Sequence, residues 1–242
     1  MGPRRINFRP MTRLPKIPRL RAKPAICRRA FERIFAFFGP RHWWPGETRE
    51  EIIIGAVLTQ NTNWRNVEKA IENLKRADAL DFHQMAALAP AALAELIRPA
   101  GYYNIKAGRL QSVCRYFIER CKGNLDRLRN VDDTTLRAEL LATHGVGRET
   151  ADSILLYALE RPVFVIDAYT LRIGVRHGWF APETKYEAAR SFFERSLRGD
   201  VTLYNEYHAL LVAVGNRYCK PKPSCAGCPL NTRDWSRPDR TL

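Results

Sequence analysis

The feature that most constrains this chain is a pair of glycines between two helical patterns. Gly145-Val146-Gly147 follows an apolar-periodic segment, and a second periodic segment begins at Arg148. Glycines on both sides of a valine allow a tight hairpin with exposed backbone N–H groups, and the second helix starts at that turn. Amides at a helix N-terminus bind phosphate without sequence-specific side chains. The three hairpin residues and Arg148 are therefore candidate phosphate contacts, although plain helical hairpins also contain glycine.

An acidic residue, Asp167, follows the hairpin and is a candidate for either a structural or a catalytic role. Asp167 stands 20 residues after Gly147, directly behind the apolar run at residues 162–166. That run is short and has no second strand to pair with, so we expect an extended loop. Asp167 precedes another periodic segment and is a good N-cap for a helix there. A carboxylate can also stabilise positive charge that develops in a transition state, and both roles are compatible.

The remaining periodic segments predict an all-α chain. Residues 50–60 are apolar on nearly every face, which is typical of a helix at the centre of a protein. Apolar residues recur at helical spacing in several other segments. These further predicted helices cover residues 64–75, 104–121, 134–142, 148–159, 186–197 and 204–217.

The charge of the chain points to a polyanionic partner. The formal net charge is +15, and nucleic acid is the commonest polyanion bound by such proteins. Residues 1–29 contain ten basic residues, no acidic ones and five prolines, so we expect no regular helix or strand there. This arm either binds along the DNA backbone or is a solvated, disordered tail. No apolar run approaches the length of a membrane span, and the arm lacks the apolar core of a secretory signal.

The six cysteines do not form the pattern of a disulfide framework. Cys219, Cys225 and Cys228 lie within ten residues near the C-terminus, which indicates a metal site in a reducing compartment. The other three, Cys27, Cys114 and Cys121, lie in helical patterns and are expected to be ordinary buried or half-buried thiols.

The hairpin, the following helix and the apolar run that ends in Asp167 resemble the helix-hairpin-helix DNA glycosylases of the endonuclease III kind. The resemblance implies that Asp167 is the catalytic carboxylate. Bifunctional members of that family carry a lysine two residues after the second glycine, and its amine forms a Schiff base with the sugar. This chain has Glu149 there, which cannot form one. The difference favours a monofunctional enzyme that uses water, although another amine such as Lys106 could serve in principle.

Further segments resemble the bacterial 3-methyladenine DNA glycosylases built on the same fold. The resemblance runs from about residue 43 to about residue 172 and includes WWP at 43–45, GAVLTQNT at 55–62 and RPAGYYN at 98–104. It implies that Trp43 and Trp64, with Pro45 beside them, form a pocket for the flipped base. An alkylated purine is cationic, so indole faces add a cation–π interaction. Tryptophans of a core are the alternative interpretation.

The same resemblance assigns two residues to the gap that base flipping leaves in the duplex. Gln60 falls where the family has a wedge residue that replaces the flipped base, and Tyr102 falls where a second wedge contacts the opposite strand. For Gln60 the alternative is a hydrogen bond between helices.

The cysteine loop resembles the iron–sulfur loop of the family but departs from it twice. The family spacing is Cys-x6-Cys-x2-Cys-x5-Cys, whereas this chain is one residue short in the first gap and has Asp234 in the fourth position. The resemblance implies a [4Fe–4S] cluster on Cys219, Cys225 and Cys228, with Asp234 as a possible fourth ligand. Zinc and an empty loop are the alternatives.

Together these observations predict an all-α, two-lobed helix-hairpin-helix DNA glycosylase fold with a C-terminal iron–sulfur loop. The expected parts are a flexible arm (1–29), a six-helix barrel with the hairpin (45–159), and a second helical domain (30–44 plus 160–242). The expected function is monofunctional removal of damaged bases, above all alkylated purines, from double-stranded DNA by a cytoplasmic monomer at the bacterial nucleoid. The alternatives are a glycosylase and abasic-site lyase for oxidised pyrimidines, and a non-catalytic protein that binds damaged DNA.

Overall fold

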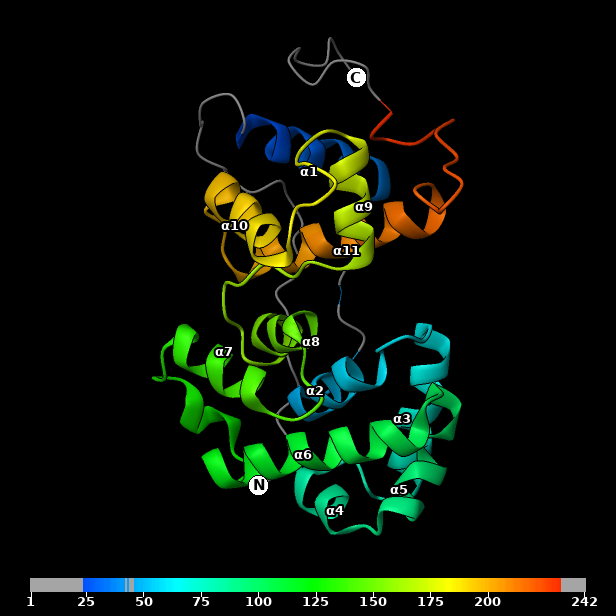
Figure 1. Cartoon of the computed structure of the whole chain (residues 1–242), viewed down its shortest axis with the longest axis vertical. Coiled ribbons are helices and arrows are strands. Elements are labelled where there is room, and N and C mark those ends of the chain that lie inside the picture. Colours follow the sequence, from blue (N-terminus) through cyan, green and yellow to red (C-terminus); the bar gives the residue numbers. More distant parts are fainter. Residues whose placement is uncertain (1–23, 42, 44–45, 232–242) are drawn as a thin grey trace. The chain divides into compact units, whose positions relative to one another are not determined.

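The structure, a computed structural model, describes residues 24–41, 43 and 46–231 (Figure 1). They form two compact units, of which the first holds residues 46–161 and the second holds residues 24–41, 43 and 162–231. Both units are helical, and no β-strand forms in the described part of the chain. The all-α prediction is confirmed.

The first unit is organised around two helices, α2 and α6. The long helix α6 packs against α4 and α5 on one side and also contacts α2 (Figure 1). The segments of this unit are α2 (Arg49–Leu58), α3 (Trp64–Arg76), α4 (Phe82–Ala87), α5 (Pro90–Leu96), η1 (Arg98–Ala100), α6 (Tyr103–Cys121), η2 (Leu125–Leu128), α7 (Asp133–Ala142), α8 (Arg148–Ser153) and the π-helical η3 (Ile154–Ala158).

The second unit combines a helix from the N-terminal part of the chain with three from the C-terminal part. Helix α1 packs against α10 and α11, and α9 packs against α11. Their bounds are α1 (Pro24–Phe38), α9 (Ala168–Arg176), α10 (Tyr186–Leu197) and α11 (Val201–Arg217).

Short polar side chains begin many of the helices. Each accepts a hydrogen bond from an amide in the first helical turn, which has no partner within the helix itself. The residues that cap a helix in this way are Thr48, Asn63, Asp81, Asp132, Asp167 and Asp200.

Helix α2 is the buried centre of the first unit, as its apolar sequence predicts. Ile52, Ile53, Val57 and Leu58 have no exposed surface. The buried ammonium of Lys106 donates 2.8 Å hydrogen bonds to the carbonyls of Leu58, at the end of α2, and Ala100. This lysine therefore satisfies carbonyls that have no partner within their own helices.

An ion pair joins the two helices that flank the Gly-Val-Gly hairpin. Arg137 on α7 donates two hydrogen bonds to Asp152 on α8, at 2.6 and 3.1 Å, and Asp152 is fully buried. Paired bonds of this kind fix a planar geometry. Removing one partner of such a buried pair typically costs about 3–5 kcal/mol, because the other charge is left uncompensated. The angle between α7 and α8 is held in this way.

Two sequence expectations about helix bounds are corrected. Residues 148–159, expected to form one helix, begin as α8 and continue as the π-helical η3. The basic arm, expected to be irregular through residue 29, is helical from Pro24 onward. Proline is tolerated in the first turn of a helix because the N–H that it lacks would have no partner there. Cys27, Ala30, Phe31 and Ile34 then form a buried stripe at helical spacing.

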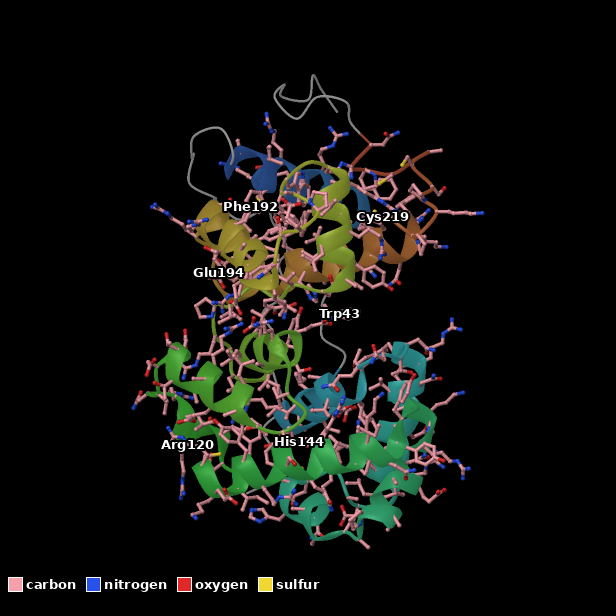
Figure 2. All side chains as sticks on the ribbon, viewed as in Figure 1. Trp43, Arg120, His144, Phe192, Glu194 and Cys219 are labelled. Atoms are coloured by element: carbon pink, nitrogen blue, oxygen red, sulfur yellow. The ribbon has the colours of Figure 1, made fainter. Side chains whose placement is uncertain are left out.

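The extended segment 162–166 is held by aromatic packing in the second unit. Phe164 stacks on Phe193 of α10 with a centroid distance of 4.3 Å, and its edge meets the rings of Tyr204 and Tyr207. Its backbone amide donates to Glu194 of α10, which Figure 2 labels. The segment forms no regular element, as predicted. Within the described residues, no helix combines the length and apolar character that a membrane span requires.

Candidate active site and DNA-binding hairpin

The hairpin between α7 and α8 contains the glycine conformation that its sequence requires. Gly145 has a φ of +84°, which side chains other than glycine rarely adopt. Gly147 is exposed, has an extended backbone and begins α8 without a capping side chain. Gly147 and the exposed Arg148 therefore present the start of α8 to solvent. The expectation that all hairpin amides are exposed is corrected, because Val146 is buried and its amide donates to the carbonyl of Thr143 at 3.1 Å.

Gln60, which follows α2, and Arg109 of α6 support the hairpin through side-chain contacts. The side-chain amide of Gln60 donates to the carbonyl of Gly145 and to the hydroxyl of Thr150, both at 3.0 Å. The side-chain oxygen of Gln60 accepts a short hydrogen bond from Arg109 of α6. The side-chain amide of Gln60 therefore hydrogen-bonds to the hairpin, α8 and α6. This matches the alternative interpretation of Gln60 as a residue that joins helices by hydrogen bonds. Its role as a wedge stays a prediction.

Arg109 also fills the space beside the hairpin glycine. A Cβ atom at Gly145 would lie 2.1 Å from Cγ of Arg109, whereas a Cβ at Gly147 would meet nothing within 4 Å. Gly145 is therefore constrained both by its left-handed backbone and by Arg109, whereas neither constraint applies to Gly147. Sequence analysis missed Arg109, since nothing in the pattern of α6 separates it from an ordinary surface arginine.

Asp167 is buried at the N-terminus of α9. Its Oδ1 accepts a 2.6 Å hydrogen bond from the amide of Thr170, and its Oδ2 lies 3.7 Å from Nε2 of His208 on α11. The expected capping role is confirmed. Burial raises the pKa of Asp167, but His208 and Thr170 lower it more, so the net pKa lies below its usual range. The buried carboxylate is therefore ionised at neutral pH, in the favourable field of a helix N-terminus.

The aromatic residues proposed for the base pocket and the second wedge lie in both units. Trp43 of the second unit and Trp64, the first residue of α3, are half-buried. Pro45 lies outside the described residues. Tyr102 is 66% exposed and has a left-handed backbone at the start of α6. Its exposure is compatible with contact to DNA, and its wedge role stays a prediction.

The position that carries the catalytic lysine in bifunctional relatives is exposed here and holds an acid. Glu149 lies in the first turn of α8. The alternative amine, Lys106, is only 1% exposed. Burial, together with the charge of Arg109, lowers its pKa to about 8. A lowered pKa suits a nucleophilic amine. Its burial and its two hydrogen bonds to carbonyls argue for a structural role of Lys106 and against the alternative in which it serves as a substitute nucleophile.

The cysteine loop follows α11 and is tied to α9. Arg176 of α9 donates to Sγ of Cys219 at 3.2 Å and to two backbone carbonyls of the loop, and Figure 2 labels Cys219 at its start. Burial raises the pKa of Cys228, and Cys225 and Cys219 add to the rise, whereas the Leu230 amide lowers it.

No group of three His, Cys, Asp or Glu side chains among the described residues is arranged to hold a metal ion. The expected fourth ligand, Asp234, lies outside those residues. By its chemistry the set of three thiols on one loop fits a thiolate-binding metal or cluster, and the predicted iron–sulfur loop stays a proposal.

Comparison with known proteins decides the family. Residues 54–198, which include the hairpin and Asp167, match the HhH-GPD superfamily of base excision DNA repair proteins. The chain belongs to this superfamily. The family resemblance inferred from the hairpin and Asp167 is confirmed.

Relatives and solved structures of the superfamily cover most of the chain. A Methanocaldococcus jannaschii protein classed by its name as a DNA repair glycosylase is 48% identical over 196 residues, 80% of this chain and 89% of that protein. Endonuclease III of Thermotoga maritima is 32% identical over 73% of this chain and 78% of its own length. A solved H. pylori 3-methyladenine DNA glycosylase bound to 1,N6-ethenoadenine has a TM-score of 0.69 and 28% identity, covering 81% of this chain and 97% of that chain.

The difference between the two hairpin glycines is testable. Gly145→Ala should lower the free energy of unfolding by about 1–3 kcal/mol. The alanine would have to adopt a left-handed backbone conformation, and its Cβ would displace the side chain of Arg109. Gly147→Ala is the matched control and should change stability by no more than about 0.5 kcal/mol. Urea unfolding of both variants measures the difference. Equal stabilities would show that Arg109 does not constrain the hairpin.

Proposed function

We propose that this chain is a monofunctional DNA glycosylase that removes alkylated purines by hydrolysis, with Asp167 as the catalytic carboxylate. The observation that carries the proposal is the buried carboxylate of Asp167, which caps the N-terminus of α9 and faces His208, in a chain of the HhH-GPD superfamily. Buried carboxylates kept ionised by their surroundings are typical of functional sites.

The reaction needs only this carboxylate and water. The bond between the sugar C1′ and the purine nitrogen breaks, and the purine leaves with the bonding electron pair, which neutralises its positive charge. Water adds to the sugar and releases a proton to solvent. The transition state resembles an oxocarbenium ion, and the negative charge of Asp167 stabilises it. An alkylated purine is already a good leaving group, so a second acid is not required.

Aromatic residues and a related structure support the substrate class. Trp43 and Trp64 offer indole faces, which attract a cationic ring by about 0.5–2 kcal/mol. The H. pylori structure is that of a 3-methyladenine DNA glycosylase, and it has 1,N6-ethenoadenine bound, a neutral modified purine that an indole face can also stack on. We infer that the two tryptophans, with Pro45, stack on the flipped base.

The hairpin is proposed to hold the DNA backbone. Gly147 and Arg148 expose the start of α8, where amides and the helix dipole favour a phosphate. Gly145 and Val146 shape the turn from inside. Tyr102 and Gln60 are proposed to fill the gap left by the flipped base. The partner is double-stranded DNA, and the protein is proposed to act as a monomer in the cytoplasm.

A second candidate is a glycosylase and abasic-site lyase for oxidised pyrimidines. It is favoured by the 32% identity to the endonuclease III of Thermotoga maritima. Glu149 in the lysine position and the enclosed amine of Lys106 argue against it, since a lyase needs an amine at the sugar carbon. A non-catalytic damage-binding protein would need Asp167 only as the cap of α9, a role that Asn can also fill, so the loss of excision in Asp167→Asn separates the two cases.

Asp167→Asn tests the proposed function. The amide preserves the helix cap but not the charge, so the variant should bind DNA normally and lose base excision. Asp200→Asn, a cap of α11 in the same unit, is the control and should remain active. The assay uses duplexes with 3-methyladenine, 7-methylguanine, hypoxanthine, thymine glycol, 1,N6-ethenoadenine or an abasic site. Near-normal excision by Asp167→Asn would overturn the assignment, and excision of thymine glycol alone would overturn the substrate class.

Strand cleavage separates the first candidate from the second. Because Glu149 replaces the lysine, excision should leave an intact abasic strand that breaks only after hot alkali, and borohydride should trap no protein–DNA adduct. The same duplexes, with and without alkali, provide the measurement. A strong borohydride-trapped adduct with the wild-type protein would establish lyase chemistry and contradict the monofunctional assignment.

The cysteine loop is proposed to hold a [4Fe–4S] cluster. Cys219, Cys225 and Cys228 supply three thiolates, and Asp234 is the proposed fourth ligand. When bound, the cluster would stiffen the loop that Arg176 ties to α9, and it would take no part in the chemistry. Three thiolates with one carboxylate also suit zinc, which is the alternative.

Metal analysis of the purified protein decides this proposal. We expect iron and inorganic sulfide in equal amounts and a broad visible absorbance from thiolate-bound iron. Cys228→Ser should lose both, whereas Cys114→Ala, which removes a thiol buried in the first unit, should retain them. Zinc without iron, or a metal-free loop in freshly purified protein, would contradict the cluster.

A further inference from the structure

We propose that His208 is a positioning residue: it lies beside the buried carboxylate of Asp167 and compensates its negative charge for catalysis. The inference rests on the proposed function of Asp167 and adds a residue that neither the family resemblance nor the sequence pattern singled out. His208 lies in the middle of the apolar helix α11, where a lone histidine gives no signal in the sequence.

The two oxygens of the Asp167 carboxylate have different surroundings. Oδ1 accepts the amide of Thr170 at 2.6 Å and is used as the helix cap. Oδ2 faces Nε2 of His208 at 3.7 Å, and both side chains are at least nine-tenths buried. The second contact is longer than a hydrogen bond, so Oδ2 keeps a lone pair for water or for the sugar cation. His208 thus lies beside this oxygen without a hydrogen bond to it.

The position of His208 is set by the packing of α11 against its neighbours. On α9, the Tyr169 hydroxyl donates to the side-chain oxygen of Asn216 at 2.6 Å, and the Tyr169 ring lies against Gly215. On the other side of α11, the Tyr207 hydroxyl donates to the carbonyl of Cys27 on α1. These contacts hold the helix that carries His208 against the helix that begins at Asp167.

Other charged groups on these helices are engaged elsewhere. Glu206 of α11 accepts the backbone amide of Arg41 at 2.6 Å. The guanidinium of Arg172 on α9 donates to the carbonyl of Cys219 and lies over the Tyr169 ring. His208 is therefore the side chain that the geometry places beside Oδ2. Without it, the pKa of Asp167 would rise, because only Thr170 would then oppose the effect of burial, and a protonated acid cannot stabilise an oxocarbenium ion.

His208→Leu and His208→Gln test the inference. Leu fills the space without a donor, whereas Gln returns an N–H group to a similar position. With the duplex that the wild-type protein cleaves best, His208→Leu should slow single-turnover excision by roughly tenfold or more, equivalent to about 1.4 kcal/mol of transition-state stabilisation. Affinity for a duplex with a non-cleavable abasic analogue should stay near wild type. The melting temperature of His208→Leu should fall, because the buried Asp167 loses a compensating partner, so excision is measured well below it. His208→Gln should recover part of the rate.

Controls separate this inference from the proposed function. His83→Leu, at an exposed histidine of α4, should leave excision unchanged. Wild-type excision rates in both His208 variants would overturn the positioning role while Asp167→Asn remains inactive. A rate loss that His208→Gln does not recover, and that an equal loss of DNA affinity accounts for, would overturn it as well. An active Asp167→Asn would instead overturn the proposed function, and the role of His208 with it.

Discussion

An ionised carboxylate inside a protein must be compensated, because removing it from water costs several kcal/mol even after the protein relaxes. At Asp167 the compensation comes from the start of α9 and from His208 on α11. The second unit is arranged around this requirement. Aromatic packing of Phe164 holds the chain that leads to Asp167, and helix packing holds His208 opposite it. In the proposed function, this carboxylate supplies the negative charge that stabilises the sugar cation.

The hairpin in the first unit is held by a different kind of interaction. Its shape does not follow from the two glycines alone, because Gln60 and Arg109, which are distant in sequence, bond to it or fill the space beside it. The buried pair of Arg137 and Asp152 fixes the helices on either side. The hairpin is thus held in shape by residues distant in sequence, and Gly147 and the start of α8 are exposed.

Local patterns predicted the helices well, because apolar periodicity and capping residues act within a few positions of one another. The cap at Asp167 and the left-handed Gly145 belong to this class. The partners of these residues could not be predicted in the same way. His208 stands 41 positions after Asp167 in an otherwise apolar helix, and Arg109 resembles a surface arginine until the fold brings it to Gly145. The helical start at Pro24 was missed because proline was weighed as a helix breaker without regard to its place in the first turn.

The contact between Gly145 and Arg109 has a consequence for how such chains can diverge. A side chain at position 145 and the stem of Arg109 compete for the same space, as a side chain at position 215 and the ring of Tyr169 do in the second unit. A substitution of the glycine alone would be selected against, because a chain with large side chains at both positions of the pair is overpacked. Across descendants of this sequence, the two positions of each pair should be inherited together, and a change at one should be followed by a compensating change at the other.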